Sequence, residues 1–169
     1  MKILVIGANG LIGSTIFRIL SQSKDFSVHG TIRNHTALAS VPDDLRENIV
    51  TNVDLLDDYK IADMLHCYEP HVVVNCAGLT KHRPEGANPL SALPINSMFP
   101  HKLARLCALS DARVIHISTD CVFSGLKGDY SEEDHPDATE LYGISKAIGE
   151  IDYPNAVTIR TSTIGHERK

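Results

Sequence analysis

Two groups of residues in this chain carry side chains suited to proton transfer beside a bound substrate. Ser118, Thr119 and Asp120 follow an apolar segment, and Tyr142 and Lys146 lie four residues apart further along. Residues at this spacing are neighbours on one face of a helix. A free tyrosine titrates at about pH 10, and a nearby ammonium lowers that pKa by favouring the phenolate. The pair therefore predicts a tyrosine proton donor, and Thr119 could hold a substrate carbonyl beside it.

A glycine-rich turn near the N-terminus predicts a site for a phosphate group. The segment Gly7-Ala-Asn-Gly-Leu-Ile-Gly13 follows an apolar run at residues 2–6 and precedes a helical apolar pattern. Glycines let the backbone approach a pyrophosphate, and a helix N-terminus offers free N–H groups and a positive dipole end. The spacing is G-x-x-G-x-x-G rather than G-x-G-x-x-G, so the placement directly after the first strand carries the prediction of dinucleotide binding.

The end of the second predicted strand, residues 26–32, distinguishes between two cofactors. An acidic residue there would bind the adenosine ribose 2′-hydroxyl, whereas an arginine accommodates a 2′-phosphate. Positions 30–34 contain no acid and include Arg33. This favours NADP(H), with NAD(H) as the alternative. The alternative is that Arg33 is a solvent-exposed loop residue with no role in cofactor binding.

Strand-like apolar segments alternate with helical patterns along the whole chain. The predicted strands are residues 2–6, 26–32, 49–53, 71–75, 114–117 and 156–160, and the predicted later helices are residues 57–67, 95–109 and 142–151, with loops at 80–94 and 125–141. Alternation of this kind predicts an α/β fold, a doubly wound parallel sheet of the Rossmann type, in one domain over residues 1–169. Ligands of such sheets bind outside the carboxyl ends of the strands, where the two reactive groups and the glycine turn would meet.

The composition of the 169 residues is that of a globular protein, with 43% hydrophobic and 22% charged residues. The net charge of -5 gives no basic surface, so nucleic acid is not an expected partner. No apolar run reaches the roughly 20 residues that span a bilayer. The first apolar run is shorter than the signal-peptide core of about 7–15 residues, so a cytoplasmic location and no membrane partner are expected. The cysteines and histidines lack metal-ligand spacing, so no metal is expected, and a homodimer is left open.

The ordered set of motifs resembles the extended short-chain dehydrogenase/reductases, and within them the dTDP-4-dehydrorhamnose reductase (RmlD-like) branch. The matching segments are Gly7-x-x-Gly10-x-x-Gly13, Asn75-Cys-Ala-Gly78, Ser118-Thr-Asp-x-Val-Phe123 and Tyr142-Gly-x-Ser-Lys146, and the resemblance covers essentially the whole chain. The resemblance implies an NADP(H)-dependent reductase of a nucleotide-linked 4-keto-6-deoxysugar in surface polysaccharide synthesis. A hydride would reach C4 while Tyr142 supplies the proton.

The same resemblance implies roles for individual positions. The catalytic residues would be Thr119, Tyr142 and Lys146. Cofactor contacts would come from Gly7, Asn9, Gly10, Leu11, Ile12, Gly13, Arg33, Asp54, Leu55, Cys76, Ala77, Gly78, Tyr142 and Lys146. The substrate would be bordered by Asp120, Val122 and Phe123, and Asn96 would face the same site.

The sequence departs from the family pattern in two respects. Cys121 stands where the family usually has a tyrosine, so the identity of the sugar substrate is left open. The chain also stops soon after the sixth strand, before the family's substrate-binding lobe, which indicates a fragment or a short form. A sugar-nucleotide epimerase or dehydratase of the same superfamily is one alternative. The others are a non-catalytic NADP-binding regulatory module, as in a subunit of methionine adenosyltransferase, and an α/β domain for another nucleotide.

Overall fold

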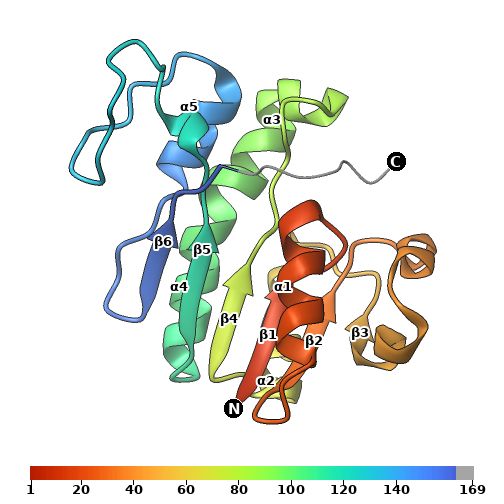
Figure 1. Ribbon diagram of the computed structural model, residues 1–169. Coiled ribbons are helices and arrows are strands. Elements are labelled where there is room, and N and C mark those ends of the chain that lie inside the picture. The colour runs from red at the N-terminus through yellow and green to blue at the C-terminus, as the bar shows by residue number, and fades with distance from the viewer. Residues whose placement is uncertain (163–169) are drawn as a thin grey trace.

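A parallel β-sheet runs through the centre of the molecule (Figure 1). The computed structural model describes residues 1–162, and the sheet there has 6 strands in the order β3-β2-β1-β4-β5-β6. The strands are β1 (Lys2–Ile6), β2 (Ser27–Thr31), β3 (Ile49–Val50), β4 (Val72–Asn75), β5 (Arg113–Ile117) and β6 (Ala156–Ile159), and all neighbours are parallel. The chain moves outward from β1 twice, so the predicted doubly wound α/β fold is confirmed. The predicted domain extends to residue 169, and its last seven residues, 163–169, lie outside the described part of the chain.

Helices cover much of both faces of this sheet. The α-helices of the described residues are α1 (Leu11–Ser21), α2 (Asp58–Tyr68), α3 (Pro89–Ala92), α4 (Phe99–Leu109) and α5 (Leu141–Ile148). A π-helical segment (Leu93–Met98) joins α3 to α4, and 3₁₀ helices occur at His35–Ser40, Asp43–Asn48, Pro84–Ala87 and Asp120–Val122. Helix α1 lies over one face of the sheet, and α2 and α4 lie over the other (Figure 1). Within residues 1–162, no helix has the length and apolar character that crossing a bilayer requires.

Alternate residues of β1 enter two separate hydrophobic cores. Ile3 and Val5 pack on one face of the sheet with Phe17 of α1. Leu4 packs on the opposite face with Leu103 of α4. Successive side chains of a strand point to opposite faces, and a parallel strand covered on both faces is therefore apolar throughout. This explains why the first strand could be placed to the residue from its sequence.

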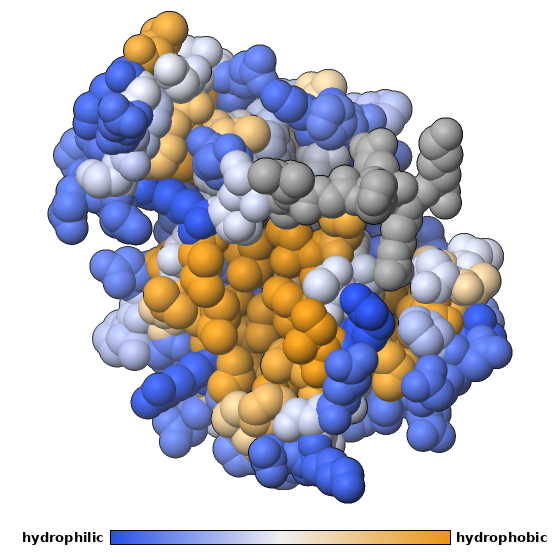
Figure 2. Space-filling view, viewed as in Figure 1, coloured by the Kyte–Doolittle hydropathy of each residue, from blue (hydrophilic) through white to orange (hydrophobic). Residues whose placement is uncertain are grey.

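The α1 face of the sheet continues as an apolar surface beyond α1 (Figure 2). Ile115 and Ile117 of β5 belong to the edge of the α1-side core, and the strand register places them beside Val157 and Ile159 of β6. Val157 is 51% exposed and Ile159 is 46% exposed. Within residues 1–162, no helix lies over this part of the sheet (Figure 1). Such exposure is unusual for an all-parallel sheet, which is normally covered on both faces.

The region predicted as a loop over residues 80–94 is helical in its second half, so that prediction was wrong. Helix α3 begins at Pro89 because Oδ1 of Asn88 accepts the N–H of Leu90 at 3.0 Å, and proline is favoured at the first helical position. Pro100 follows the π-helical segment directly, at the second residue of α4. A proline that looks like a loop signal thus marks the start of α3.

Two elements are shorter than predicted. Strand β3 ends at Val50 rather than residue 53, because Asn52 adopts a left-handed conformation with φ 59° and turns the chain. Helix α5 ends at Ile148 rather than residue 151. Gly149 follows it, and its backbone lies so close to Asn96 that a Cβ there would be 1.8 Å from the Asn96 carbonyl oxygen.

Candidate active site

The glycine turn after β1 is held by close backbone packing. Gly7 has φ 80°, and a Cβ on it would lie 3.1 Å from the backbone nitrogen of Ala77. A Cβ on Gly13 would lie 2.1 Å from the carbonyl oxygen of Gly7, which already accepts the N–H of Gly10 at 3.0 Å. Gly10 precedes α1 and offers no side-chain cap, so the first N–H groups of α1 point outward uncapped. These features are those of an anion-binding helix N-terminus.

The other residues predicted near the turn differ in exposure. Asn9 and Leu11 are exposed at its tip, and Ile12 is half-buried. The Cys76 side chain instead packs into the α1-side core, where burial raises the pKa of its thiol to about 12. Ala77, after β4, donates its N–H to Oδ1 of Asn75 at 3.2 Å. Any cofactor contact of Cys76 would therefore have to come from its backbone.

Three predicted cofactor residues lie at the carboxyl ends of β2 and β3. Arg33 is exposed just beyond β2. Asp54 is also exposed, and its carboxylate accepts the N–H of Leu56 at 3.0 Å. Leu55 packs against the core on the α2 and α4 side, so its side chain serves packing. The strand order brings all three to the same edge of the sheet as the glycine turn.

Thr119 and Tyr142 meet where β5 ends and α5 begins. Oγ1 of Thr119 accepts the N–H of Cys121 at 3.2 Å and donates to the carboxylate of Asp120 at 3.1 Å. Burial raises the pKa of the Tyr142 phenol above 10.0, while a hydrogen bond with Thr119 acts in the opposite direction. Lys146 is not among the causes of this shift. The lowering of the Tyr142 pKa expected from the spacing is therefore not found in this structure.

Lys146 is buried at 4% exposure, one helical turn after Tyr142. Its Nζ donates to the carbonyl oxygen of Ile117 at 2.8 Å and lies 3.2 Å from Nε2 of His116. Burial lowers the pKa of Lys146 to about 8, because desolvation disfavours the charged form. Nearby Glu150 acts against this shift. A lysine that titrates in this range can change its charge near the working pH of a cell.

Close packing positions α5, and sequence reasoning missed the residues responsible. A Cβ on Gly143 would lie 2.2 Å from the carbonyl oxygen of Cys121. Ser145 is fully buried, and its carbonyl oxygen accepts the hydroxyl of Ser97 at 2.7 Å. Its own hydroxyl accepts Nδ2 of Asn96 at 3.0 Å. Small residues between Tyr142 and Lys146 were the available signal, since only they permit such an approach.

Asn96 acts as a brace in this structure. Its Oδ1 accepts the N–H of Leu79 at 2.8 Å, and its Nδ2 donates to the carbonyl oxygen of Leu79 at 2.9 Å and to Ser145. The side chain is 1% exposed, and its amide hydrogens have partners. Asn96 therefore fixes α5 against the chain after β4, and its expected contact with substrate stays a prediction.

The predicted substrate residues after β5 have three different environments. Asp120 is exposed, and hydrogen bonds from Ser162 and Thr119 lower the pKa of its carboxyl group. Val122 is completely buried, so any contact with the substrate would have to come from its backbone. The Phe123 ring stacks on Tyr130 with centroids 4.3 Å apart.

An arginine links Phe123 to the strand end that carries Thr119. The guanidinium carbon of Arg160 lies 5.0 Å from the centre of the Phe123 ring. Arg160 also forms two hydrogen bonds with Glu150, at 2.8 and 2.9 Å. Glu150 in turn accepts the hydroxyl of Ser118 at 2.8 Å. Phe123 is therefore fixed by residues that follow β6 and α5 as well as by its own loop.

Sequence reasoning also missed a buried histidine beneath the site. His116 and Asn75 are both fully buried, and Nδ1 of His116 lies 3.0 Å from Nδ2 of Asn75. Burial lowers the pKa of His116 to about 3, so the ring is neutral. The available signal was a histidine inside an apolar strand, two residues before Ser118. Among the described residues, no group of three or more histidine, cysteine or acidic side chains could hold a metal ion.

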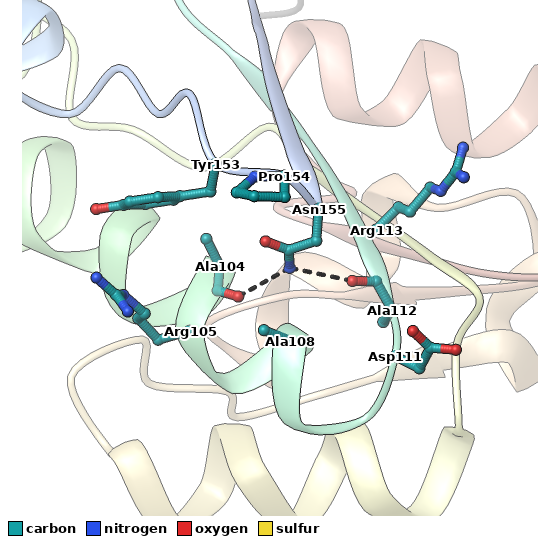
Figure 3. Close-up of a pocket in the computed structure, with 9 residues that line it drawn as sticks. All are labelled: Ala104, Arg105, Ala108, Asp111, Ala112, Arg113, Tyr153, Pro154 and Asn155. Carbon is teal, nitrogen blue, oxygen red and sulfur yellow. Dashed lines mark hydrogen bonds between the residues drawn. The ribbon is translucent and has the colours of Figure 1, made fainter.

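A cavity of about 520 Å³ lies at the opposite end of the sheet, where β5 begins (Figure 3). Nδ2 of Asn155 donates there to the carbonyl oxygens of Ala104 and Ala112, at 3.0 and 3.2 Å. The Arg105 guanidinium lies 5.1 Å from the Tyr153 ring. None of the predicted site residues lines this cavity. It is therefore separate from the chemistry at the carboxyl ends of the strands.

Comparison with known proteins identifies the family. The sequence model of the RmlD substrate binding domain matches residues 1–168. The chain belongs to this family. The RmlD family assignment agrees with the resemblance that the four motifs carry, and the family's structures contain the same doubly wound sheet.

Relatives in the curated proteins include a reductase and a subunit of a methionine adenosyltransferase. The "Probable low-salt glycan biosynthesis reductase Agl14" of Haloferax volcanii is 32% identical over 97% of this chain and 54% of its own length. "Methionine adenosyltransferase 2 subunit beta" of Rattus norvegicus is 31% identical over 88% of this chain and 41% of its own length. The RmlD-family chain described here thus spans about half the length of the relatives it matches.

Solved structures with the same fold include reductases and epimerases. A "hypothetical dTDP-4-dehydrorhamnose reductase" from Sulfolobus tokodaii is 28% identical, has a TM-score of 0.78, and matches 95% of this chain and 55% of its own. A "UDP-Glucuronic acid 4-epimerase" from Bacillus cereus, solved in complex with NAD, is 25% identical with a TM-score of 0.74. It matches 88% of this chain and 49% of its own.

Proposed function

We propose that this chain is the dinucleotide-binding part of an NADP(H)-dependent reductase that acts on a nucleotide-linked 4-keto-6-deoxysugar. The proposal is supported by the hydrogen bond between Thr119 and Tyr142, by the position of Lys146 one turn further along α5, and by the glycine turn at the same end of the sheet. Gly7 contacts Ala77, and Nζ of Lys146 lies 4.0 Å from the position of a Cβ on the next residue, Gly78. The predicted proton donor and the predicted pyrophosphate site therefore share one edge of the sheet.

The glycine turn fits a dinucleotide. The first turn of α1 offers uncapped N–H groups, so the backbone itself would face the pyrophosphate. Gly13 has no room for a Cβ, and Gly7 has little room and a left-handed φ of 80°. Arg33 would pair with a 2′-phosphate, which favours NADP(H) over NAD(H). The bound cofactor supplies the hydride. The NAD complex of the related epimerase supports the nicotinamide class of cofactor.

The residues of this chain would orient the ketone and supply the proton. Thr119 would hold the C4 carbonyl, and Tyr142 would give its phenolic proton to the oxygen as the hydride reaches the carbon. The ketone thus gains one hydride and one proton and becomes an alcohol. Lys146 in its charged form would stabilise the phenolate that remains on Tyr142. Asp120 and Phe123 would border the sugar nucleotide.

The names of the relatives support the substrate class and the biological role. One solved relative is called a dTDP-4-dehydrorhamnose reductase, and the archaeal relative is called a glycan biosynthesis reductase. Both names agree with a sugar reductase that serves surface polysaccharide synthesis. The part of the relatives that this chain does not match would supply the second wall of the sugar pocket, in a separate substrate-binding lobe.

Substitution of Tyr142 tests the assignment of the proton donor. Tyr142→Phe removes the phenolic proton but keeps the ring, so NADPH oxidation by a dTDP-linked 4-keto-6-deoxysugar should fall by about 100-fold or more. NADPH binding, followed by its fluorescence, should change little. Tyr59→Phe is the matched control, because Tyr59 is 92% exposed on α2. Full turnover by the Tyr142 variant would exclude the mechanism.

Two other functions have specific support. The likeness to a UDP-glucuronic acid 4-epimerase favours an epimerase or dehydratase, which returns its cofactor to the starting state. Such an enzyme would convert substrate without net oxidation of NADPH. The likeness to a methionine adenosyltransferase subunit favours a regulatory module. That module would bind NADPH yet consume none with any sugar nucleotide, and Tyr142→Phe would have no effect on it.

A further inference from the structure

Asn75, His116 and Lys146 form a buried chain of polar contacts behind the proposed catalytic residues. Nδ2 of Asn75 lies 3.0 Å from Nδ1 of His116, and Nε2 of His116 lies 3.2 Å from Nζ of Lys146. Asn75 and His116 are 0% exposed and Lys146 is 4% exposed. Buried polar groups are nearly always hydrogen-bonded. The partners of each atom therefore determine where the protons lie.

The orientation of the Asn75 amide follows from its contact with the backbone. Its Oδ1 lies 3.2 Å from the backbone N–H of Ala77, which can only donate. The oxygen must therefore face Ala77, and the NH₂ group must face His116. Since an amide nitrogen can only donate, Nδ1 of His116 must accept a hydrogen bond.

The ring of His116 then carries its single hydrogen on Nε2. Burial lowers the pKa of His116 to about 3, and the charges of Lys146 and His101 act in the same direction, so the imidazole is neutral. A neutral imidazole has one N–H and one lone pair. Because Nδ1 uses its lone pair for Asn75, the N–H lies on Nε2 and points at Lys146.

The Nε2–H of His116 cannot form a hydrogen bond with a charged Lys146. A charged lysine has three donors and no acceptor, so Nε2–H of His116 would face another donor. A neutral amine has a lone pair that accepts Nε2–H, and one of its hydrogens still bonds the carbonyl oxygen of Ile117 at 2.8 Å. The hydrogen bonds among Asn75, His116 and Lys146 are all satisfied only when Lys146 is neutral.

We infer that Asn75 and His116 are positioning residues that hold Lys146 as a neutral amine, by presenting an imidazole N–H to its side-chain nitrogen. Other groups that face Lys146 come from three elements. Cys76 follows β4, but its thiol is neutral because burial raises its pKa to about 12. Glu150, just beyond the end of α5, is the anion that favours the charged lysine. His101 of α4 acts on His116 rather than on Lys146.

The consequence for catalysis rests on the proposed function, whereas the placement of the protons does not. Only the charged form of Lys146 would stabilise a Tyr142 phenolate. Protonation of Lys146 in this chain must overcome both burial and the opposing N–H of His116. Burial lowers the Lys146 pKa to about 8, and the N–H of His116 would lower it further, so the proposed reductase would lose activity as the pH rises towards 8. Asn75→Asp would raise the pH at which this activity is lost.

Nuclear magnetic resonance on the 169-residue chain, with no cofactor or substrate, tests the proton placement directly. Long-range ¹H–¹⁵N spectra report which nitrogen of a histidine carries hydrogen, and His116→Gln assigns the His116 signals by their loss. Lysine ¹³Cε shifts followed from pH 6 to 11 report the Lys146 titration, assigned with Lys146→Met. We expect hydrogen on Nε2 of His116, and a Lys146 midpoint about two units or more below the exposed lysines.

Asn75→Asp should reverse the arrangement. A carboxylate at position 75 accepts both the N–H of Ala77 and an N–H on Nδ1, so the hydrogen of His116 should move to Nδ1. Nε2 would then accept from a charged Lys146, whose midpoint should rise by about one pH unit or more. A negative charge acting at a distance would raise the midpoint but leave the hydrogen on Nε2. The position of the hydrogen therefore separates the two explanations.

Three results would overturn the inference. They are hydrogen on Nδ1 of His116 in the unaltered chain, a Lys146 that titrates with the exposed lysines, and an Asn75→Asp variant whose His116 hydrogen stays on Nε2. His66→Gln is the control, since His66 is exposed on α2 and should change neither signal. None of these measurements needs turnover, so failure of the proposed reductase activity would be seen separately.

Discussion

Buried ionisable side chains dominate the site at the scale of single residues. His116 and Lys146 lie in contact inside the protein, and burial lowers the pKa of both, to about 3 and about 8. Each group therefore loses its proton at a lower pH in the folded chain than in the unfolded chain. Such groups lower stability wherever the unfolded chain would hold the extra proton.

The pH dependence of stability should reveal His116. Between about pH 6.5 and pH 3 the unfolded chain binds a proton at this residue and the folded chain does not, so stability falls as the pH falls. The limiting slope is about 1.4 kcal/mol per pH unit. Urea unfolding at several pH values should show a flatter profile for His116→Gln than for the unaltered chain. Equal slopes over this range would contradict the depressed pKa.

The contact between His116 and Asn75 could not be predicted from the sequence. The two residues are 41 positions apart, and they meet because β4 and β5 pair with Asn75 opposite His116. Register between strands depends on the packing of both faces, which a local pattern does not reveal. The glycine turn after β1 and the position of Tyr142 and Lys146 on one helix were predictable, because they depend on spacing within one segment. The expected effect of Lys146 on the Tyr142 pKa was not found.

At the scale of elements, α5 is placed by small residues rather than by apolar contacts alone. Gly143 lies against the carbonyl oxygen of Cys121, and Gly149 lies against that of Asn96. The helix is thereby fixed at both ends, to the end of β5 and to the π-helical segment before α4. Its start could be read from the sequence, but its early end could not, because Gly149 has a long-range partner.

Gly143→Ala should destabilise the protein although alanine favours helices. Helix propensity alone would stabilise by about 1 kcal/mol. A Cβ at this position would lie 2.2 Å from the Cys121 carbonyl oxygen, so α5 has to move away from β5. Overpacking of this kind costs about 1–3 kcal/mol. Thermal unfolding should therefore show a lower Tm.

Ile144→Ala is the control for this experiment, because Ile144 lies on the outer side of α5 at 39% exposure. Its effect should be smaller than that of Gly143→Ala. A Gly143 variant as stable as the unaltered chain would show that α5 tolerates movement. In that case the close approach would not be what places Tyr142 beside Thr119.

At the scale of the whole molecule, the strand order explains how distant motifs reach one site. The glycine turn follows β1, and the reactive residues follow β5, with only β4 between these strands in the sheet. The alternation of strand and helix patterns predicted a doubly wound parallel sheet, and the structure supplies the order of its strands. The exposed apolar face of β5 and β6 was not predictable, because each of those strands looks like an ordinary buried strand in the sequence.

The proposed function requires that a nicotinamide dinucleotide binds at the glycine turn. Titration of the 169-residue chain with NADPH and with NADH, followed by fluorescence, tests this most directly. We expect saturable binding that is tighter for NADPH, by about tenfold if Arg33 pairs with the 2′-phosphate. Gly13→Ala should abolish it, because a Cβ there would lie 2.1 Å from the Gly7 carbonyl oxygen. Absence of binding, or equal binding by a folded Gly13→Ala variant, would contradict the account.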